Sequence, residues 1–191
     1  MPSSLPTPAA PAQDETRSVL AIPAFRKLWN SMVFSSLGDW LGLLATTALA
    51  QKLSGGSYAT ANFAIAGVFI ARLLPAVFLG PIAGVIADRL DRRKLMVSVD
   101  ILRAALYISI PIVNTYLWLY TAVVLVECLT LFWSPAKEAT VPNLVGKEKL
   151  ESANQVSLLA AYGTAPVAAI LFSLLTLFAN AIESLFPFNI G

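Results

Sequence analysis

The sequence predicts an all-α integral membrane protein, and three observations lead to this fold class. Of the 191 residues, 57% are hydrophobic and only 13% are charged, about half the charge density of a typical soluble domain. Five apolar stretches each approach the roughly 20 residues that a helix needs to cross a bilayer. The Lys and Arg residues outside these stretches fall almost entirely on one side of the resulting topology, as is typical of membrane proteins.

The composition also argues against several classes of function. The chain has no His and a single Cys, Cys128, so the commonest general base, a disulfide framework and a multi-cysteine zinc site are all excluded. The segments between the apolar stretches are too short for a catalytic domain, and a net charge of +2 is too small to indicate a nucleic-acid partner. We therefore expect no enzyme activity, metal, cofactor or nucleic-acid partner.

The apolar stretches define the expected organisation. Residues 1–24 are interpreted as a disordered tail rich in Pro, Ala and Ser with a short interfacial lead-in, and residues 25–191 as one transmembrane helical domain. The predicted helices cover residues 28–50, 60–87, 95–113, 117–133 and 154–178. A tight hairpin around Asn114 would join the third to the fourth. The apolar end of the chain suggests that it stops before a sixth helix, and a natural five-helix protein is the alternative.

The positions of Lys and Arg predict the orientation. With the N-terminus in the cytoplasm, ten of these residues lie on the cytoplasmic side and Lys52 alone lies on the other. Cytoplasmic loops are enriched in Lys and Arg. We therefore expect a multi-pass protein of the cell (inner or plasma) membrane with a cytoplasmic N-terminus.

Ionisable residues inside the apolar stretches are the candidate functional residues, because a charge in hydrocarbon is costly. Asp39 belongs to a polar stripe on one face of the first helix, about 11 residues or roughly 17 Å from the inner end. Arg72 and Glu127 lie at similar depth on the second and fourth helices. These three residues predict a shared polar cavity that forms the substrate and proton pathway. The alternative is that they form ion pairs that lock the helices together.

Proton coupling would depend on the carboxylates. A carboxylate surrounded by hydrocarbon is harder to ionise, so Asp39 and Glu127 are candidates for taking up and releasing protons. A nearby Arg72 would favour their charged forms instead, and the sequence does not rank the two effects. For Asp100 and Arg103, three residues apart on the third helix, we expect a structural ion pair.

The loop between the second and third helices carries the most specific motif. Gly80 and Gly84 have the spacing that allows close contact with another helix. Asp88 could pair with nearby cations or cap a helix. The predicted cytoplasmic gating loop consists of Gly84, Asp88, Arg89, Arg92, Arg93 and Lys94. The alternative is an ordinary positively charged cytoplasmic loop.

This loop resembles the signature between the second and third helices of the major facilitator superfamily, G-x-x-x-D-R/K-x-G-x-R/K-R/K. Asp91 stands where many members have Gly, and Asp tolerates the left-handed backbone that such a turn can require. Three further segments resemble the branch that holds macrolide and siderophore exporters. They read FRKLWNSMVFSSLGDW, VDILRAALY and FWSPAKEATVPNLV, and the resemblance covers residues 25–178.

The resemblance implies a transporter built from two six-helix halves. This chain would supply helices one to five of the N-terminal half, apparently truncated, and a C-terminal half is the expected partner. Where the family's antiporter signature has G-P-x-G-G, this chain has APVAA at 165–169.

The implied function is secondary active transport, by alternating access, with proton-coupled efflux of an amphipathic small molecule. Two alternatives remain open. One is a transporter of lysophospholipid or another lipid, and the other is a non-transporting scaffold or fragment.

Overall fold

The computed structural model describes residues 19–87 and 90–185, and these residues form helices joined by short turns. The helices are α2 (Pro23–Leu53), α3 (Tyr58–Ala87), α4 (Arg92–Val113), α5 (Tyr116–Val145), the short η1 (Lys147–Lys149), α6 (Leu150–Tyr162) and α7 (Thr164–Leu185). No strand occurs among the described residues, so the predicted all-α class is confirmed. The predicted tail falls largely on residues 1–18, which lie outside the described part.

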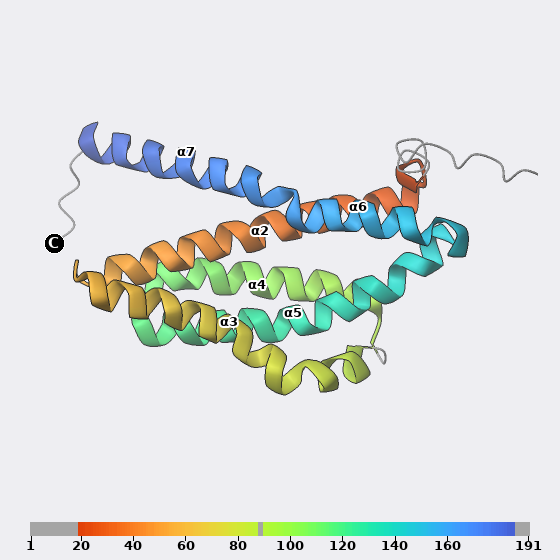
Figure 1. Ribbon diagram of the computed structural model, residues 1–191, viewed down its shortest axis with the longest axis horizontal. Coiled ribbons are helices and arrows are strands. Elements are labelled where there is room, and N and C mark those ends of the chain that lie inside the picture. Colours follow the sequence, from red (N-terminus) through yellow and green to blue (C-terminus); the bar gives the residue numbers. More distant parts are fainter. Residues whose placement is uncertain (1–18, 88–89, 186–191) are drawn as a thin grey trace, which may run out of the picture.

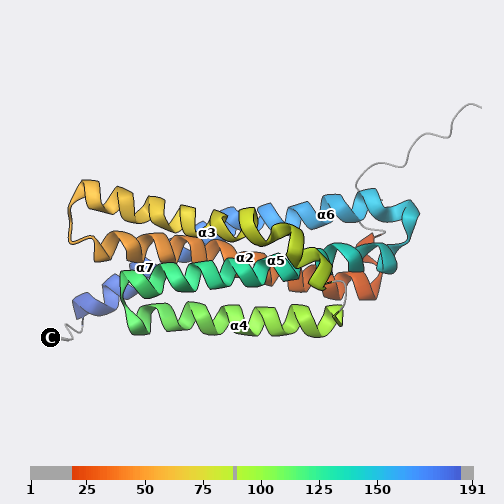
Figure 2. The same ribbon diagram turned by 90° about the horizontal axis from the view of Figure 1, so that it is seen from below.

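Five helical segments are long and apolar enough to cross a membrane. They are Pro23–Leu53, Tyr58–Gly80, Arg92–Val113, Tyr116–Val145 and Lys147–Ile182. Their long axes run roughly parallel in both ribbon views (Figures 1 and 2). The five predicted membrane-spanning helices are therefore present, and the protein is a multi-pass membrane protein.

The helices pack in two groups that share α2. On one side, α5 contacts both α3 and α4, and α3 also contacts α2. On the other side, α6 and α7 pack against α2, and α7 diverges from α2 toward its C-terminal end (Figure 1). Two indoles of α2 fix α6 in place, because Trp29 Nε1 donates to the Val156 carbonyl and Trp40 Nε1 donates to the Ala161 carbonyl, each at 2.9 Å.

The fifth predicted span is divided into α6 and α7 at Gly163. Proline has no backbone N–H, so Pro166 cannot donate to the carbonyl of Tyr162 four residues earlier. A proline is tolerated in the first turn of a helix, where that donor has no helical partner. The chain therefore ends one helix at Tyr162 and begins the next at Thr164.

The helix that contains the fourth predicted span is longer than that span. The span is expected at residues 117–133, and α5 continues to Val145 through Pro135 and Pro142. Each proline removes one helical hydrogen bond without ending the helix, and it bends the helix axis. The C-terminal end of α5 is instead held by packing, with Ala136, Val141 and Val145 buried.

The predicted hairpin at Asn114 is present. Asn114 ends α4 in a left-handed conformation with φ of 51°, and its N–H donates to the Ile110 carbonyl at 2.9 Å. Thr115 then caps α5 by accepting a hydrogen bond from the Trp118 N–H at 3.3 Å. Asn is one of the few residues with a side chain that adopts this conformation readily.

This conformation makes Asn114 sensitive to substitution. We expect Asn114→Val to lower the free energy of unfolding by about 1–2 kcal/mol, because a β-branched residue is strained in the left-handed region. Asn114→Gly should stay within about 0.5 kcal/mol of the parent, because Gly adopts positive φ without a steric penalty. Unfolding of both variants in detergent micelles, followed by helical circular dichroism, checks the difference. Equal stabilities would contradict the assigned hairpin.

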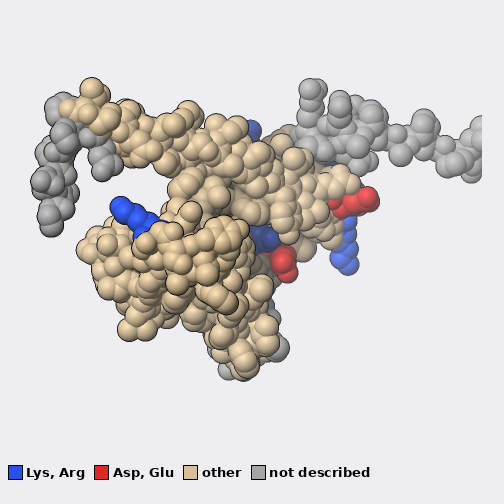
Figure 3. Space-filling view, turned by 60° about the vertical axis from the view of Figure 1, so that its left-hand side comes forward, with Lys and Arg blue, Asp and Glu red and all other residues tan. Residues whose placement is uncertain are grey.

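Most of the surface is apolar, as a lipid-facing bundle requires. Large hydrophobic side chains are exposed along every spanning helix, among them Phe63 at 79% and Ile112 at 76%. The space-filling view shows few charged groups on the visible face (Figure 3). Charged side chains inside the bundle are therefore exceptions that need a local explanation.

Candidate transport site

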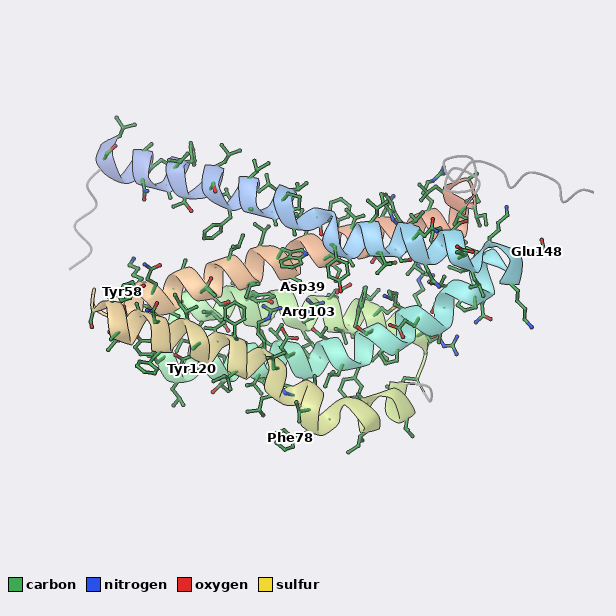
Figure 4. All side chains as sticks on the ribbon, viewed as in Figure 1. Asp39, Tyr58, Phe78, Arg103, Tyr120 and Glu148 are labelled. Atoms are coloured by element: carbon green, nitrogen blue, oxygen red, sulfur yellow. The ribbon has the colours of Figure 1, made fainter. Side chains whose placement is uncertain are left out.

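Two ion pairs lie in the middle of the bundle, each joining two different helices. Arg72 of α3 contacts Glu127 of α5, with 2.8 Å between Arg72 Nη2 and Glu127 Oε1. Arg103 of α4 contacts Asp39 of α2 through its Nη2, and Figure 4 shows these two side chains between α2 and α4. Pairing satisfies charges that would otherwise be very costly at this depth.

Arg103 is shared between two carboxylates. Its Nη1 lies 3.6 Å from Asp100 Oδ1, so the ion pair expected from the spacing of three is present. The Ser35 hydroxyl connects the same groups, since it donates to Asp100 at 3.0 Å and accepts from Arg103 Nη1 at 3.3 Å. The direct contact of the guanidinium is with Asp39. Because Asp39 lies on α2, the spacing of residues along α4 does not predict this contact.

The two pairs lie close to each other. Tyr107 of α4 lies near Arg72, Arg103 and Glu127, and its buried hydroxyl has no hydrogen-bond partner among the described residues. Arg103 also lies near Glu127. We call the group formed by Asp39, Arg72, Asp100, Arg103, Tyr107 and Glu127 the polar cluster. With all groups ionised except Tyr107, it holds three carboxylates and two guanidiniums, a net charge of −1.

Apolar packing flanks the polar cluster on both sides. One buried cluster toward the Asn114 hairpin includes Ala50, Val68 and Leu119. Another, toward the opposite end, includes Met32, Met96 and Trp133. The charges therefore lie between two hydrophobic layers, an environment in which electrostatic interactions are stronger than in water.

Three cavities lie between α2 and α4 beside the polar cluster. An apolar one of about 470 Å³ is lined by Gly42 and Tyr107 among others, and the other two contain charged residues. One of about 400 Å³ is lined by Ser35, Asp39, Asp100, Arg103 and Tyr107, together with apolar neighbours. The other, of about 640 Å³, lies toward the N-terminal end of α4, and Lys27, Arg92 and Arg93 are among its lining residues. Asp100 lines both.

Asp39 thus lines the cavity of about 400 Å³. Arg72 and Glu127 line none of the described cavities, and their side chains are only 20% and 16% exposed. The structure places the three predicted pathway residues in one electrostatic cluster, but it pairs Asp39 with Arg103 and Arg72 with Glu127.

The predicted gating loop is only partly described, because Asp88 and Arg89 lie outside the described residues. The turn does not require a left-handed backbone at Asp91. The φ of this residue is −63°, and its carboxylate caps α4 by accepting a hydrogen bond from the Lys94 N–H at 2.9 Å. An Asp at this position satisfies one of the free N–H groups at the start of the helix, which explains why Gly is not needed.

The other described residues of this loop have different surroundings. Arg92 donates to the Ala139 carbonyl of α5 at 2.8 Å, whereas Arg93 and Lys94 are exposed. A Cβ built on Gly80 or Gly84 would meet no atom within 4 Å. The close helix contact expected at these two glycines is therefore absent from the described part of the chain.

The cap at Asp91 is testable. We expect Asp91→Ala to lower the free energy of unfolding by about 1 kcal/mol, the usual effect of losing an N-cap side chain. Asp91→Ser should retain most of the stability, because a Ser hydroxyl can accept the same hydrogen bond. Unfolding followed by circular dichroism measures both variants, and equal losses for Ala and Ser would show that capping is not what Asp91 contributes.

Comparison with known proteins identifies the family. The sequence model of the transmembrane secretion effectors, a group of major facilitator superfamily proteins, matches residues 15–186. This chain belongs to the major facilitator superfamily. It is 32% identical over 130 residues to the MFS-type transporter YfiS of Bacillus subtilis, which covers 68% of this chain and 30% of YfiS.

Two further relatives of this superfamily member have names that refer to efflux. Macrolide efflux protein A of Enterococcus faecalis is 37% identical over 82 residues, 40% of this chain and 25% of the relative. The putative bacilysin exporter BacE of Bacillus subtilis is 28% identical over 125 residues, 64% of this chain and 30% of BacE. The chain spans less than a third of the length of these relatives. No solved structure matches it significantly.

Membership of the major facilitator superfamily places the chain in a family of transporters rather than enzymes. Sequence reasoning missed the interhelical contact of Arg103 with Asp39 and the electrostatic link through Tyr107. A usable signal was present, because Tyr107 follows Arg103 by four residues and therefore lies on the same face of α4.

Proposed function

We propose that this chain is the N-terminal part of a secondary active transporter that exports an amphipathic small molecule in exchange for protons. Membership of the major facilitator superfamily supports transport, and the names of two relatives support efflux. The observation that carries the proposal is the polar cluster, in which five ionisable groups from four helices lie between apolar layers. A purely structural bundle gains little from burying charges, because desolvation offsets most of their attraction.

The cavity between α2 and α4 supports a role for Asp39 in the pathway. It combines charged groups with apolar residues such as Phe34 and Ala104, a mixture that suits an amphipathic ligand. In the proposal, the coupling ion is a proton, and binding or release of the proton changes which ion pairs hold the helices together. Rocking of this helix group against a second half would then expose the site to each side alternately.

The remaining parts of the proposal concern the whole protein. The N-terminus would lie in the cytoplasm of a cell whose plasma or inner membrane holds the transporter, as the distribution of Lys and Arg favours. A C-terminal half would complete the translocation pathway, and the gating loop would contact it. The short match to much longer relatives supports a missing partner of this kind.

Reconstitution tests the proposed function. The chain would be incorporated into proteoliposomes alone and together with the remaining part of YfiS, and uptake of a fluorescent amphipathic dye would be followed under an imposed proton gradient. We expect dye flux linked to the gradient when both parts are present, and a loss of about 100-fold or more in Asp39→Asn, in which the Arg103 guanidinium loses its charged partner. Glu138→Gln, an exposed acid on α5, is the matched control and should retain flux.

The outcomes separate the candidate functions. Flux of a fluorescent lysophospholipid, but not of the dye, would favour the lipid transporter. Absence of any proton-linked flux with both parts present would contradict the proposal and favour a non-transporting scaffold.

A further inference from the structure

We infer that Asp100 is the proton-carrying carboxylate of the polar cluster, an inference that rests on the proposed function above. Asp39 and Glu127 would then serve as permanent counter-ions of the two arginines.

One carboxylate of the polar cluster has no guanidinium of its own. Three carboxylates face two guanidiniums in the polar cluster, and an uncompensated charge between apolar layers is costly. Uptake of a single proton by any one of the three carboxylates makes the cluster neutral.

The contacts indicate which carboxylate takes that proton. Protonation of Glu127 would remove the partner of Arg72 at 2.8 Å. Protonation of Asp39 would remove the partner in direct contact with Arg103, whose side chain is only 6% exposed. Removing one member of a buried pair leaves the other charge unsatisfied, which is strongly unfavourable.

Protonation of Asp100 leaves both direct pairs intact. Its oxygen lies 3.6 Å from Arg103 Nη1, beyond hydrogen-bond length, and its contact with that nitrogen runs through the Ser35 hydroxyl. A hydroxyl can donate or accept by rotating, so Ser35 can remain hydrogen-bonded to Asp100 in either protonation state.

Exposure and cavity lining also distinguish Asp100 from Glu127. Its side chain is 34% exposed, against 16% for Glu127, and it lines both charged cavities between α2 and α4. Asp39 is similarly exposed, at 31%, but it lines only the smaller cavity. The larger cavity therefore offers Asp100 a route toward the N-terminal end of α4 that the other two carboxylates lack.

Several charged groups surround Asp100. On α2 they are Lys27 and Asp39, and at the start of α4 they are the capping residue Asp91 with Arg92 and Arg93. Arg103 lies one turn after Asp100 on α4. Glu127 of α5 lies near Arg103 and is paired with Arg72 of α3. The nearby cations oppose proton uptake, whereas Asp39 and Glu127 favour it.

The inference gives the proton a mechanical consequence. Hydronium transfers a proton to the Asp100 carboxylate and leaves as water, and no other bond is made or broken. Ionised Asp100 competes with Asp39 for Arg103, whereas neutral Asp100 leaves Arg103 to Asp39 alone. Since Asp39 lies on α2 and Arg103 on α4, the proton adjusts the contact between these two helices.

Chemical labelling of the unmodified chain locates the proton. Dicyclohexylcarbodiimide enters bilayers and reacts with protonated carboxyl groups in apolar surroundings. The chain in lipid nanodiscs would be treated over a series of pH values, digested, and analysed by peptide mass spectrometry. We expect about tenfold more adduct at Asp100 than at Asp39 or Glu127, the ratio produced by a preference of about 1.4 kcal/mol for one site, with more adduct as the pH falls.

Variants supply the controls. Asp100→Asn should show no adduct at position 100, Asp100→Glu should regain labelling there, and Glu138→Gln should retain the parental pattern. Preferential labelling of Asp39 or Glu127, or no labelling of all three, would overturn the inference. Labelling needs no transport, so labelled Asp100 without flux would refute the proposed function alone. Proton-linked flux with the adduct on Asp39 or Glu127 would refute this inference alone.

Discussion

Arg103→Leu will lower the free energy of unfolding of the chain by about 3–5 kcal/mol, the cost of removing one partner from a buried ion pair. Arg103 is 5% exposed and is the direct partner of Asp39 as well as a neighbour of Asp100. Without the guanidinium, two carboxylates from α2 and α4 are left close together in an apolar surround. Chemical unfolding in detergent micelles, followed by circular dichroism, measures this loss.

The control for Arg103 lies on the same helix. Arg93 is exposed at the start of α4, and Arg93→Leu should change the stability by less than about 0.5 kcal/mol, as surface substitutions usually do. The double variant Asp39→Asn with Arg103→Gln should recover part of the loss, because it removes one of the two unpaired carboxylates. If Arg103→Leu and Arg93→Leu are equally stable, the assigned pairing is wrong.

Gly42→Ala should destabilise the contact between α2 and α4 by about 1–3 kcal/mol, the usual cost of overpacking a core. A Cβ at position 42 would lie 2.4 Å from Tyr107 Cζ and 2.6 Å from the Tyr107 hydroxyl oxygen. The Tyr107 ring would have to move, and its electrostatic interactions with Arg72 and Arg103 would change with it. The same unfolding measurement detects the effect.

Gly38 is a matched control for Gly42, one turn earlier on α2. A Cβ at Gly38 would meet nothing within 4 Å, so Gly38→Ala should be neutral or stabilise the helix by about 0.5–1 kcal/mol. In a Tyr107→Ala background, Gly42→Ala should lower the free energy of unfolding by less than it does in the parent chain, because the ring that its Cβ would meet is absent. If Gly38→Ala and Gly42→Ala lower the stability equally, the close approach of Gly42 to Tyr107 is contradicted.

The fold was largely predictable because long apolar stretches identify membrane-spanning helices without knowledge of their partners. The errors have local causes. The sequence predicts that the fourth span ends at residue 133, before Pro135, but α5 continues past this proline because its C-terminal end is packed. The division between α6 and α7 at Gly163 arises because Pro166 cannot donate a hydrogen bond to the Tyr162 carbonyl. A hydropathy pattern contains no information about this bond.

The sequence predicted which ionisable residues belong to the candidate site, but not which of them form ion pairs with one another. The polar residues of each helix could be assigned to a depth and a face from their spacing alone. Which residues meet depends on how the helices cross, and the sequence does not give those crossings. The spacing of three therefore predicted the Asp100–Arg103 contact, while the direct contact from Arg103 to Asp39 on another helix required the structure.

The central claim is that the polar cluster borders a water-filled cavity between α2 and α4. Substituted-cysteine labelling in a Cys128→Ser background tests it most directly. Ser35→Cys and Ala104→Cys place thiols on the lining of the smaller cavity without removing a charge, and Ile101→Cys places one on an exposed apolar position of α4, 64% exposed, as the lipid-facing control. We predict that a membrane-impermeant thiol reagent modifies positions 35 and 104 of the bilayer-embedded chain, and leaves position 101 unmodified. Equal protection of all three positions would contradict the account.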